Sequence, residues 1–245
     1  MIECSLSFTS RTLGVPSRME VLVPEGEGPF PVLYLLHGLG DDCRTWQRNY
    51  DLPHRMEKRG VIVVMPEGGR SYYCDVPGPV GEPWESHITG DVVGVIDQTF
   101  DTVRDASGRA LAGFSMGGYG AIMLALRHPE MFCAAASVSG AMYFAARPHP
   151  LQLDYPADLM ALLPAGKYDC FALAEKHAAA VQSVAMRLSV GRQDYLQAVN
   201  AEFHRHLEAL GLKHDYTEAD GKHDWAFCRA HLHEAIDFCV ERLRR

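Results

Sequence analysis

The chain has 245 residues, 47% of them hydrophobic, so it can bury a full core and we expect one domain over residues 1–245. Its 31 acidic and 23 basic residues give a net charge of −8, without any block of five or six like charges. This excludes a basic surface for nucleic acid and a basic patch for anionic membranes, so we expect neither partner.

The chain start and the cysteines bear on location. Residues 1–14 alternate apolar and polar side chains and lack the basic and then apolar stretches of a signal peptide. No segment approaches the roughly 18 uninterrupted apolar residues that a membrane span needs. The 7 cysteines show no C-x-x-C spacing, which favours reduced thiols over a zinc site or planned disulfides. We therefore expect a cytoplasmic protein.

Strand signals recur along the whole chain. Residues 2–9 and 18–23 are predicted strands joined by a turn at 14–17, and they should pair antiparallel at one edge of a sheet. Apolar runs typical of strands buried on both faces follow. They are residues 31–38, 61–69, 109–114, 133–140, 184–191 and, with a more polar sequence, 213–219.

Helical patterns lie between these strands and predict the fold class. Alternating βα units imply an α/β fold in which a mostly parallel, twisted sheet of about eight strands carries helices on both faces. The proline-rich stretch 141–182 interrupts the alternation, and we expect a cap-like insertion over the top of the sheet within the same domain. The main predicted helices are residues 91–103, 117–128, 169–182, 195–210 and 228–243.

The sequence GFSMGG, residues 113–118, places Ser115 between a buried strand and a helix. A G-x-S-x-G sequence in a strand–turn–helix context is typical of a nucleophile elbow. Side chains two residues before and after the serine would collide with neighbouring backbone in such a strained turn, and glycine removes the collision. We predict that Ser115 is a nucleophile, the alternative being a serine that only closes a turn.

A serine hydroxyl needs a base to take its proton. The chain has 12 histidines, and His223 stands out because it follows the last predicted strand directly and precedes the final helix. His231 and His233 lie within that helix, where they should point along its sides. We therefore predict that His223 is the general base.

An acid must orient the imidazole and stabilise its charged form. Asp194 lies just past the strand at 184–191, where the alternative role is a simple helix N-cap. Asp220 and Asp224 compete for the acid role, but both lie too close to His223 in sequence to reach around its ring easily. The chain order serine, aspartate, histidine is that of a nucleophile-elbow enzyme.

Backbone donors for an oxyanion are expected at two places. One is the N–H of Met116, and the other is the N–H of Leu39 in the loop HGLGDD that follows the third predicted strand. Gly38 and Gly40 would let the backbone approach a substrate, although HGLG is also a tight strand-to-helix turn. His37 is predicted to be a structural hydrogen bonder of this loop and not a second base.

Five stretches resemble the putative esterase family of the α/β-hydrolase fold, over residues 18–240. They are LYLLHGLGDDCRTWQR, VVMPEGGRSYYCD, LAGFSMGGYGA, GRQDYL and GKHDWAF. The family includes tributyrin esterases, S-formylglutathione hydrolases, feruloyl esterases and the antigen 85 mycolyltransferases. Length and the HGLG loop are closest to the small tributyrin-esterase-like members, since S-formylglutathione hydrolases usually have SGLTC there. The resemblance implies hydrolysis of short-chain carboxylic esters through an acyl-enzyme on Ser115, assisted by His223 and Asp194.

The expected partner is a small-molecule ester, and assembly into a homo-oligomer stays open. Four aromatic residues are candidates for the wall of a substrate pocket, with core packing as an equal alternative. They are Tyr73, Trp84, Tyr119 and Trp225.

Three further functions stay open beside ester hydrolysis. Thioester hydrolysis, as on S-formylglutathione, and acyl transfer would use the same three side chains, whereas a non-catalytic binding module would ordinarily have lost one of them. A metal hydrolase is disfavoured because Asp237 stands where H-E-x-x-H needs its second histidine. Phosphate-binding and dinucleotide-binding glycine patterns are also missing from the sequence, so we expect no metal and no cofactor.

Overall fold

One sheet organises the chain, which the computed structural model describes over residues 1–78, 81–148, 150–151 and 154–244. Its strand order in this part of the chain is β1-β2-β4-β3-β5-β6-β7-β8. Strands β3 to β8 run parallel, and β2 pairs antiparallel with both β1 and β4. The predicted α/β class and the antiparallel N-terminal edge are therefore confirmed. The strands are β1 (Ile2–Thr9), β2 (Pro16–Val23), β3 (Val32–Leu36), β4 (Ile62–Pro66), β5 (Arg109–Phe114), β6 (Ala134–Val138), β7 (Ala185–Gly191) and β8 (His214–Ala219).

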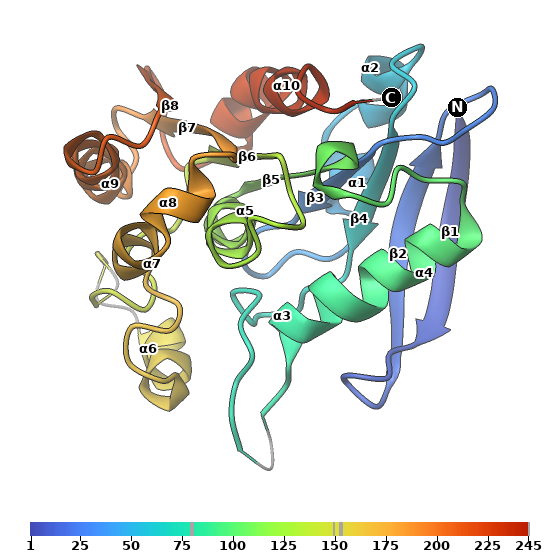
Figure 1. Ribbon diagram of the computed structural model, residues 1–245. Coiled ribbons are helices and arrows are strands. Elements are labelled where there is room, and N and C mark those ends of the chain that lie inside the picture. The colour runs from blue at the N-terminus through green and yellow to red at the C-terminus, as the bar shows by residue number, and fades with distance from the viewer. Residues whose placement is uncertain (79–80, 149, 152–153, 245) are drawn as a thin grey trace.

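Helices cover both faces of the sheet, as predicted. Figure 1 shows α10 on one side and α5 and α4 on the other, and the two apolar clusters of the core divide in the same way. The helical elements are α1 (Thr45–Asn49), α2 (Leu52–Met56), α3 (Trp84–Ser86), the π-helical turn η1 (His87–Val92), α4 (Val93–Thr99), the 3₁₀ turn η2 (Ala106–Gly108), α5 (Met116–Arg127), α6 (Asp154–Leu162), α7 (Cys170–Lys176), α8 (Ala178–Val181), α9 (Gln197–Ala209) and α10 (Trp225–Val240).

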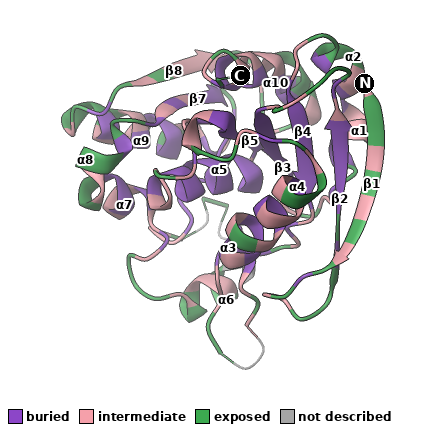
Figure 2. Cartoon of the chain, turned by 45° about the vertical axis from the view of Figure 1, so that its right-hand side comes forward, coloured by how far each residue is buried: buried purple, intermediate pink, exposed green. Residues whose placement is uncertain are grey.

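The central strands are buried on both faces, which explains their unbroken apolar sequences. In β3, Val32 and Tyr34 belong to the core layer on the α5 side, and Leu33 and Leu35 belong to the layer on the α10 side. Figure 2 shows the inner strands buried, whereas the edge strands β1 and β8 are largely intermediate or exposed. A strand that helices cover on both faces of the sheet needs apolar side chains at every position.

Several predicted helix bounds are wrong, each for a local reason. The helix predicted at 91–103 begins earlier, in η1, and ends at Thr99 because Phe100 adopts extended backbone. The last helix starts at Trp225, since the Asp224 side chain accepts a hydrogen bond from the Phe227 N–H and caps it there. The helix predicted at 169–182 is divided at His177 into α7 and α8. Helices α1, α2, α3 and α6 were not predicted, because such short segments show little periodicity.

The stretch 141–182 connects β6 to β7 and contains α6, α7 and α8. The beginning of this stretch contacts the predicted nucleophile, because the Ala141 N–H donates to the Ser115 carbonyl oxygen at 3.1 Å. Further along, the Arg147 guanidinium binds both carboxylate oxygens of Glu202 in α9, at 2.5 and 2.9 Å. Residues 149 and 152–153 of this predicted insertion lie outside the described residues.

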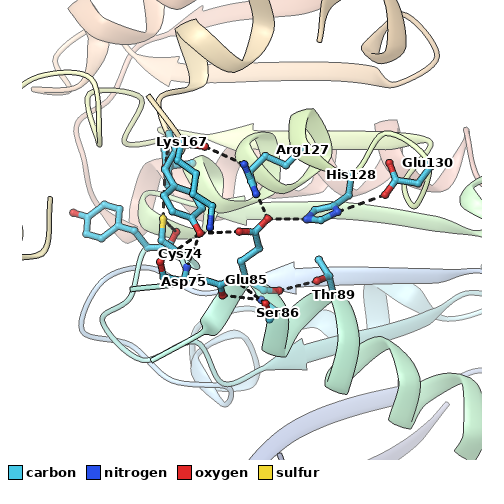
Figure 3. Close-up of polar contacts among 12 residues, drawn as sticks. Cys74, Asp75, Glu85, Ser86, Thr89, Arg127, His128, Glu130 and Lys167 are labelled. Carbon is cyan, nitrogen blue, oxygen red and sulfur yellow. Dashed lines mark hydrogen bonds and ion pairs between the residues drawn. The ribbon is translucent and has the colours of Figure 1, made fainter. Parts of the chain in front are cut away.

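A buried carboxylate, Glu85, joins three parts of the chain. Its side chain is 4% exposed, and its Oε1 accepts hydrogen bonds from Arg127 Nε at 2.5 Å and His128 Nε2 at 2.8 Å. Figure 3 shows Arg127 and His128 reaching Glu85 from the end of α5. The Tyr168 hydroxyl donates to Glu85 Oε2 at 2.8 Å, and Arg127 donates to the Lys167 carbonyl oxygen at 3.1 Å. Glu85 thus ties α3 to α5 and to the stretch 141–182.

These contacts set the ionisation of Glu85. Burial raises the pKa of Glu85, but hydrogen bonds from His128 and Arg127 and the Arg127 charge outweigh it and lower the pKa from 4.5 to about 2. A lowered pKa means that the carboxylate stabilises the fold above the pKa of the unfolded chain. That contribution is lost as the pH falls from about 4.5 toward about 2.

We expect Glu85→Gln to lower the free energy of unfolding by about 3 kcal/mol at pH 7 and by about half as much at pH 3. Urea unfolding at the two pH values measures both differences. Glu27→Gln, which changes an exposed carboxylate, should cost less than about 0.5 kcal/mol at either pH. An equal loss for Glu85→Gln at both pH values would contradict the assignment.

Candidate active site

Three predicted side chains lie at the carboxyl edge of the sheet. Ser115 directly follows β5, Asp194 lies in the loop after β7, and His223 lies in the loop after β8. The carboxyl ends of parallel strands meet at one edge, so residues far apart in sequence become neighbours there.

The turn that carries Ser115 is strained and needs both of its flanking glycines. Ser115 has φ 57° and ψ −114°, a conformation that residues other than glycine rarely adopt. A Cβ on Gly117 would lie 2.1 Å from the Leu36 carbonyl oxygen, and one on Gly113 would lie 2.4 Å from the backbone of Gly117. The first turn of α5 therefore contacts the end of β3, and Ser115 is presented at the corner.

The imidazole of His223 bridges the other two side chains. Its Nε2 lies 2.9 Å from Ser115 Oγ, and its Nδ1 lies 2.9 Å from Asp194 Oδ2. The Asp194 side chain is fully buried, and its Oδ1 accepts a hydrogen bond from the Leu196 N–H at 2.8 Å. With Nδ1–H donating to Asp194, Nε2 is free to accept the Ser115 proton. This arrangement can generate a nucleophilic alkoxide at Ser115.

The competing acids have other partners. Asp220 forms an ion pair with Arg192 at 2.9 Å, and its side chain is 84% exposed. Asp224 accepts a hydrogen bond from the Phe227 N–H at 2.9 Å, as the N-cap of α10.

The loops of Asp194 and His223 are fixed to each other. The Gln193 side chain accepts a hydrogen bond from the Gly221 N–H at 2.7 Å, and the Gln193 N–H donates to the Gly221 carbonyl oxygen at 3.0 Å. A Cβ on Gly191 would lie 2.3 Å from that same carbonyl oxygen. Sequence reasoning missed Gln193, although its place between a glycine and the predicted acid was a signal.

The predicted oxyanion donors belong to two segments that adjoin Ser115. The Asp41 N–H donates to the Gly38 carbonyl oxygen at 3.2 Å, and Gly40 has φ 84°, which defines a tight turn around Leu39. A Cβ on Gly38 would lie 3.6 Å from the Phe114 carbonyl oxygen, so the two loops are adjacent. Met116 is the first residue of α5, where helical N–H groups have no partner in the helix. Among the described residues, neither N–H has a backbone acceptor.

His37 braces the loop that carries Leu39. Its Nε2 accepts a hydrogen bond from the Gly68 N–H at 2.9 Å, and its Nδ1 lies 2.9 Å from the Gly38 carbonyl oxygen. Both ring nitrogens therefore have backbone partners within this pair of loops. The predicted structural role of His37 therefore agrees with its contacts.

Two of the four aromatic candidates lie in the core and not on an accessible pocket wall. Tyr73 and Tyr119 have no exposed surface. The Tyr73 hydroxyl donates to the His37 carbonyl oxygen at 3.0 Å, and the Tyr119 hydroxyl donates to the Tyr168 carbonyl oxygen at 2.6 Å. Each hydroxyl has a backbone acceptor inside the protein, which allows these rings to be fully buried.

The two tryptophans occupy different surroundings. Trp84 is 9% exposed and lines a pocket of about 350 Å³ at the ends of β2 and β4, together with Arg18 and Glu67. Strand β4 lies two positions from β5 in the sheet, so this pocket is set to one side of Ser115. Trp225 is half-buried and packs against Phe114, with ring centroids 5.7 Å apart.

Two aromatic residues that sequence reasoning missed contact His223 directly. The Phe114 ring lies 4.9 Å from the imidazole, and the Tyr195 ring lies 4.7 Å from it, between centroids. Phe114 immediately precedes Ser115 and Tyr195 immediately follows Asp194. That adjacency was the available signal.

The described residues hold neither a cluster of metal ligands nor a membrane-spanning helix. Over the described ranges, no three His, Cys, Asp or Glu side chains gather as metal ligands would. Nor does any helix in this part of the chain combine the length and apolar character that crossing a bilayer requires.

Comparison with known proteins places the chain among esterases. A family model described as Putative esterase matches residues 10–238. The Acetyl esterase of Caldicellulosiruptor saccharolyticus is 25% identical over a 219-residue alignment that covers 84% of this chain and 82% of that protein. Esterase Rv1288 of Mycobacterium tuberculosis is 33% identical over a 145-residue alignment that covers 54% of this chain and only 31% of that longer protein.

A solved structure gives the same fold. FphF, described as a fluorophosphonate-binding serine hydrolase of Staphylococcus aureus, has a TM-score of 0.87 at 25% sequence identity, with 98% of each chain covered. The family match contains Ser115, Asp194 and His223 within its bounds.

The contact at Gly117 yields a stability test. Gly117→Ala should lower the free energy of unfolding by about 2 kcal/mol, because the added Cβ collides with two carbonyl oxygens of the β3 end. Gly94→Ala is the matched control, since a Cβ there meets nothing within 4 Å. Gly94 lies in α4, so its replacement should stabilise the protein by up to about 1 kcal/mol. Urea unfolding measures both, and equal effects would contradict the elbow geometry.

Proposed function

Because the chain belongs to the putative esterase family, we propose that it is a serine hydrolase that cleaves short-chain carboxylic esters. The observation that carries this proposal is the continuous contact from Asp194 through His223 to Ser115, at 2.9 Å on each side of the imidazole. A nucleophile, a base and an orienting acid in hydrogen-bond reach are the arrangement that acyl transfer needs.

The first half of the reaction forms an acyl-enzyme. Ser115 Oγ attacks the ester carbonyl carbon while His223 Nε2 accepts the hydroxyl proton, and Asp194 stabilises the imidazolium that results. The N–H groups of Met116 and Leu39 would bind the oxyanion of the tetrahedral intermediate. When that intermediate collapses, His223 gives its proton to the departing alkoxide, and an alcohol leaves with the acyl group bound to Ser115.

The second half releases the acid. Water attacks the acyl carbonyl carbon as His223 accepts one of its protons, and the same two N–H groups hold the new oxyanion. Collapse of this intermediate breaks the bond to Ser115 Oγ, which recovers a proton from His223. The net reaction converts an ester and water into an acid and an alcohol.

The substrate is proposed to be a small ester, of the kind that tributyrin-esterase-like members of the family accept. The stretch 141–182 is proposed to form a cap-like part of the single domain that shapes the acyl side of the site, since it begins in contact with the Ser115 backbone. A cytoplasmic location belongs to the same proposal and is supported by the cysteines, all of which are free.

Removing the nucleophile tests the function. Ser115→Ala and His223→Ala should each lower kcat for p-nitrophenyl butyrate by about 10⁴-fold or more, and the double variant should lose little beyond that because the groups act as a unit. Wild-type hydrolysis should stop with a fluorophosphonate and survive EDTA. Retained turnover in Ser115→Ala would refute the mechanism.

Acyl-chain and thioester panels that include S-formylglutathione, and added alcohols as acceptors, would separate the ester, thioester and transferase alternatives.

The acid has its own test. Asp194→Asn should fold normally yet lose about 10⁴-fold in kcat, because an amide at this place favours the wrong tautomer of His223. Asp220→Asn and Asp224→Asn should both keep wild-type kcat, and Asp224→Asn should change stability little because the Asn side-chain oxygen can still cap α10. A large loss of kcat in Asp220→Asn or Asp224→Asn, with Asp194→Asn unaffected, would move the acid to that residue.

A further inference from the structure

Two aromatic rings pack against the imidazole of His223. Phe114 lies nearly parallel to it, with 23° between the ring planes and 4.9 Å between centroids, and Tyr195 lies 4.7 Å away at 51°. The two imidazole nitrogens contact Ser115 and Asp194, and the side chain is only 15% exposed. The His223 ring is thus surrounded mostly by the Ser115 hydroxyl, the Asp194 carboxylate and two π systems.

The Phe114 ring is held in place from behind. The Trp225 ring packs on it at 5.7 Å, and the Trp46 ring, which is fully buried, meets Trp225 edge-on at 5.6 Å. Phe114 itself is the last residue of β5 and is 6% exposed. A ring at the end of a strand, packed on Trp225 that Trp46 in turn contacts, has little freedom to turn away from His223.

Tyr195 is fixed by its position after Asp194, and its ring stays uncharged. Burial, and then the Asp194 charge, raise the pKa of Tyr195 to about 12. The phenol is therefore neutral at any pH at which an esterase would work. Its ring keeps the negative π face of an ordinary tyrosine.

The charge on His223 changes during the proposed reaction. The ring is neutral before attack and becomes imidazolium when it takes the Ser115 proton. A cation over an aromatic face is attracted by the ring quadrupole, whereas a neutral imidazole gains much less. An interaction that is stronger in the transition state than in the ground state raises the rate.

We propose that Phe114 and Tyr195 are positioning residues whose π faces stabilise the imidazolium form of His223. This inference rests on the proposed function and assigns the two rings an electrostatic effect on the barrier in addition to packing. A purely steric support would act equally well with any ring of the same shape.

Fluorinated phenylalanines separate these two effects, because fluorine weakens the negative face of the ring and changes its shape little. Phe114 would be replaced in the full-length enzyme by 4-fluoro-, 3,5-difluoro- and 3,4,5-trifluorophenylalanine. We expect kcat/KM for p-nitrophenyl butyrate to fall stepwise, by about tenfold over the series. The same series at Phe132, a core residue that packs on Tyr34, should leave kcat/KM unchanged.

A flat series at Phe114, or an equal fall at Phe132, would overturn the electrostatic assignment. At the second ring, Tyr195→Phe should stay within about twofold of wild type and Tyr195→Leu should lose about fivefold. Identical rates for these two variants would remove Tyr195 from the inference. A wild-type enzyme without ester hydrolysis would overturn the proposed function and the inference with it, whereas a flat series in an active enzyme overturns only the inference.

Discussion

The contact between the first turn of α5 and the end of β3 is the constraint on which the site depends. A Cβ on Gly117 would lie 2.1 Å from the Leu36 carbonyl oxygen, so only glycine allows the helix to start so close to the strand. That approach forces the chain to reverse sharply after β5 and holds Ser115 at φ 57°. The strain is maintained because the sheet on one side and the helix on the other leave no room to relax.

The other two side chains of the site are brought to Ser115 by strands that are neighbours in the sheet. Strands β7 and β8 pair in parallel, so the loops that follow them carry Asp194 and His223 to the same edge. Hydrogen bonds between Gln193 and Gly221 keep these loops in register. Away from the edge, the buried charge of Glu85 joins α3, α5 and the stretch 141–182. Precise geometry at the imidazole thus rests on backbone contacts more than on the Ser115, Asp194 and His223 side chains.

The strands and the meeting of Ser115, Asp194 and His223 could be predicted because their signals are local. The apolar run of β3 indicates a buried strand, and the glycines around Ser115 indicate a tight turn. Neither signal depends on distant parts of the chain. Tyr73 and Tyr119 could not be placed, since an aromatic residue has the same local pattern in a core and on a pocket wall. The burial of Glu85 was equally hidden, because its partners come from the end of α5 and from residues 167–168. Only tertiary contacts decide such positions.

If the acyl group passes through Ser115, it can be trapped there as an acyl-enzyme. The wild-type enzyme is mixed with p-nitrophenyl butyrate, quenched in acid within the first turnover and digested, and mass spectrometry then identifies the peptide that carries the acyl group. We expect one butyryl group on the peptide that contains Ser115. A butyryl group on another residue would contradict an acyl-enzyme at Ser115. So would turnover without any covalent intermediate in an enzyme that shows a burst of product in the first turnover.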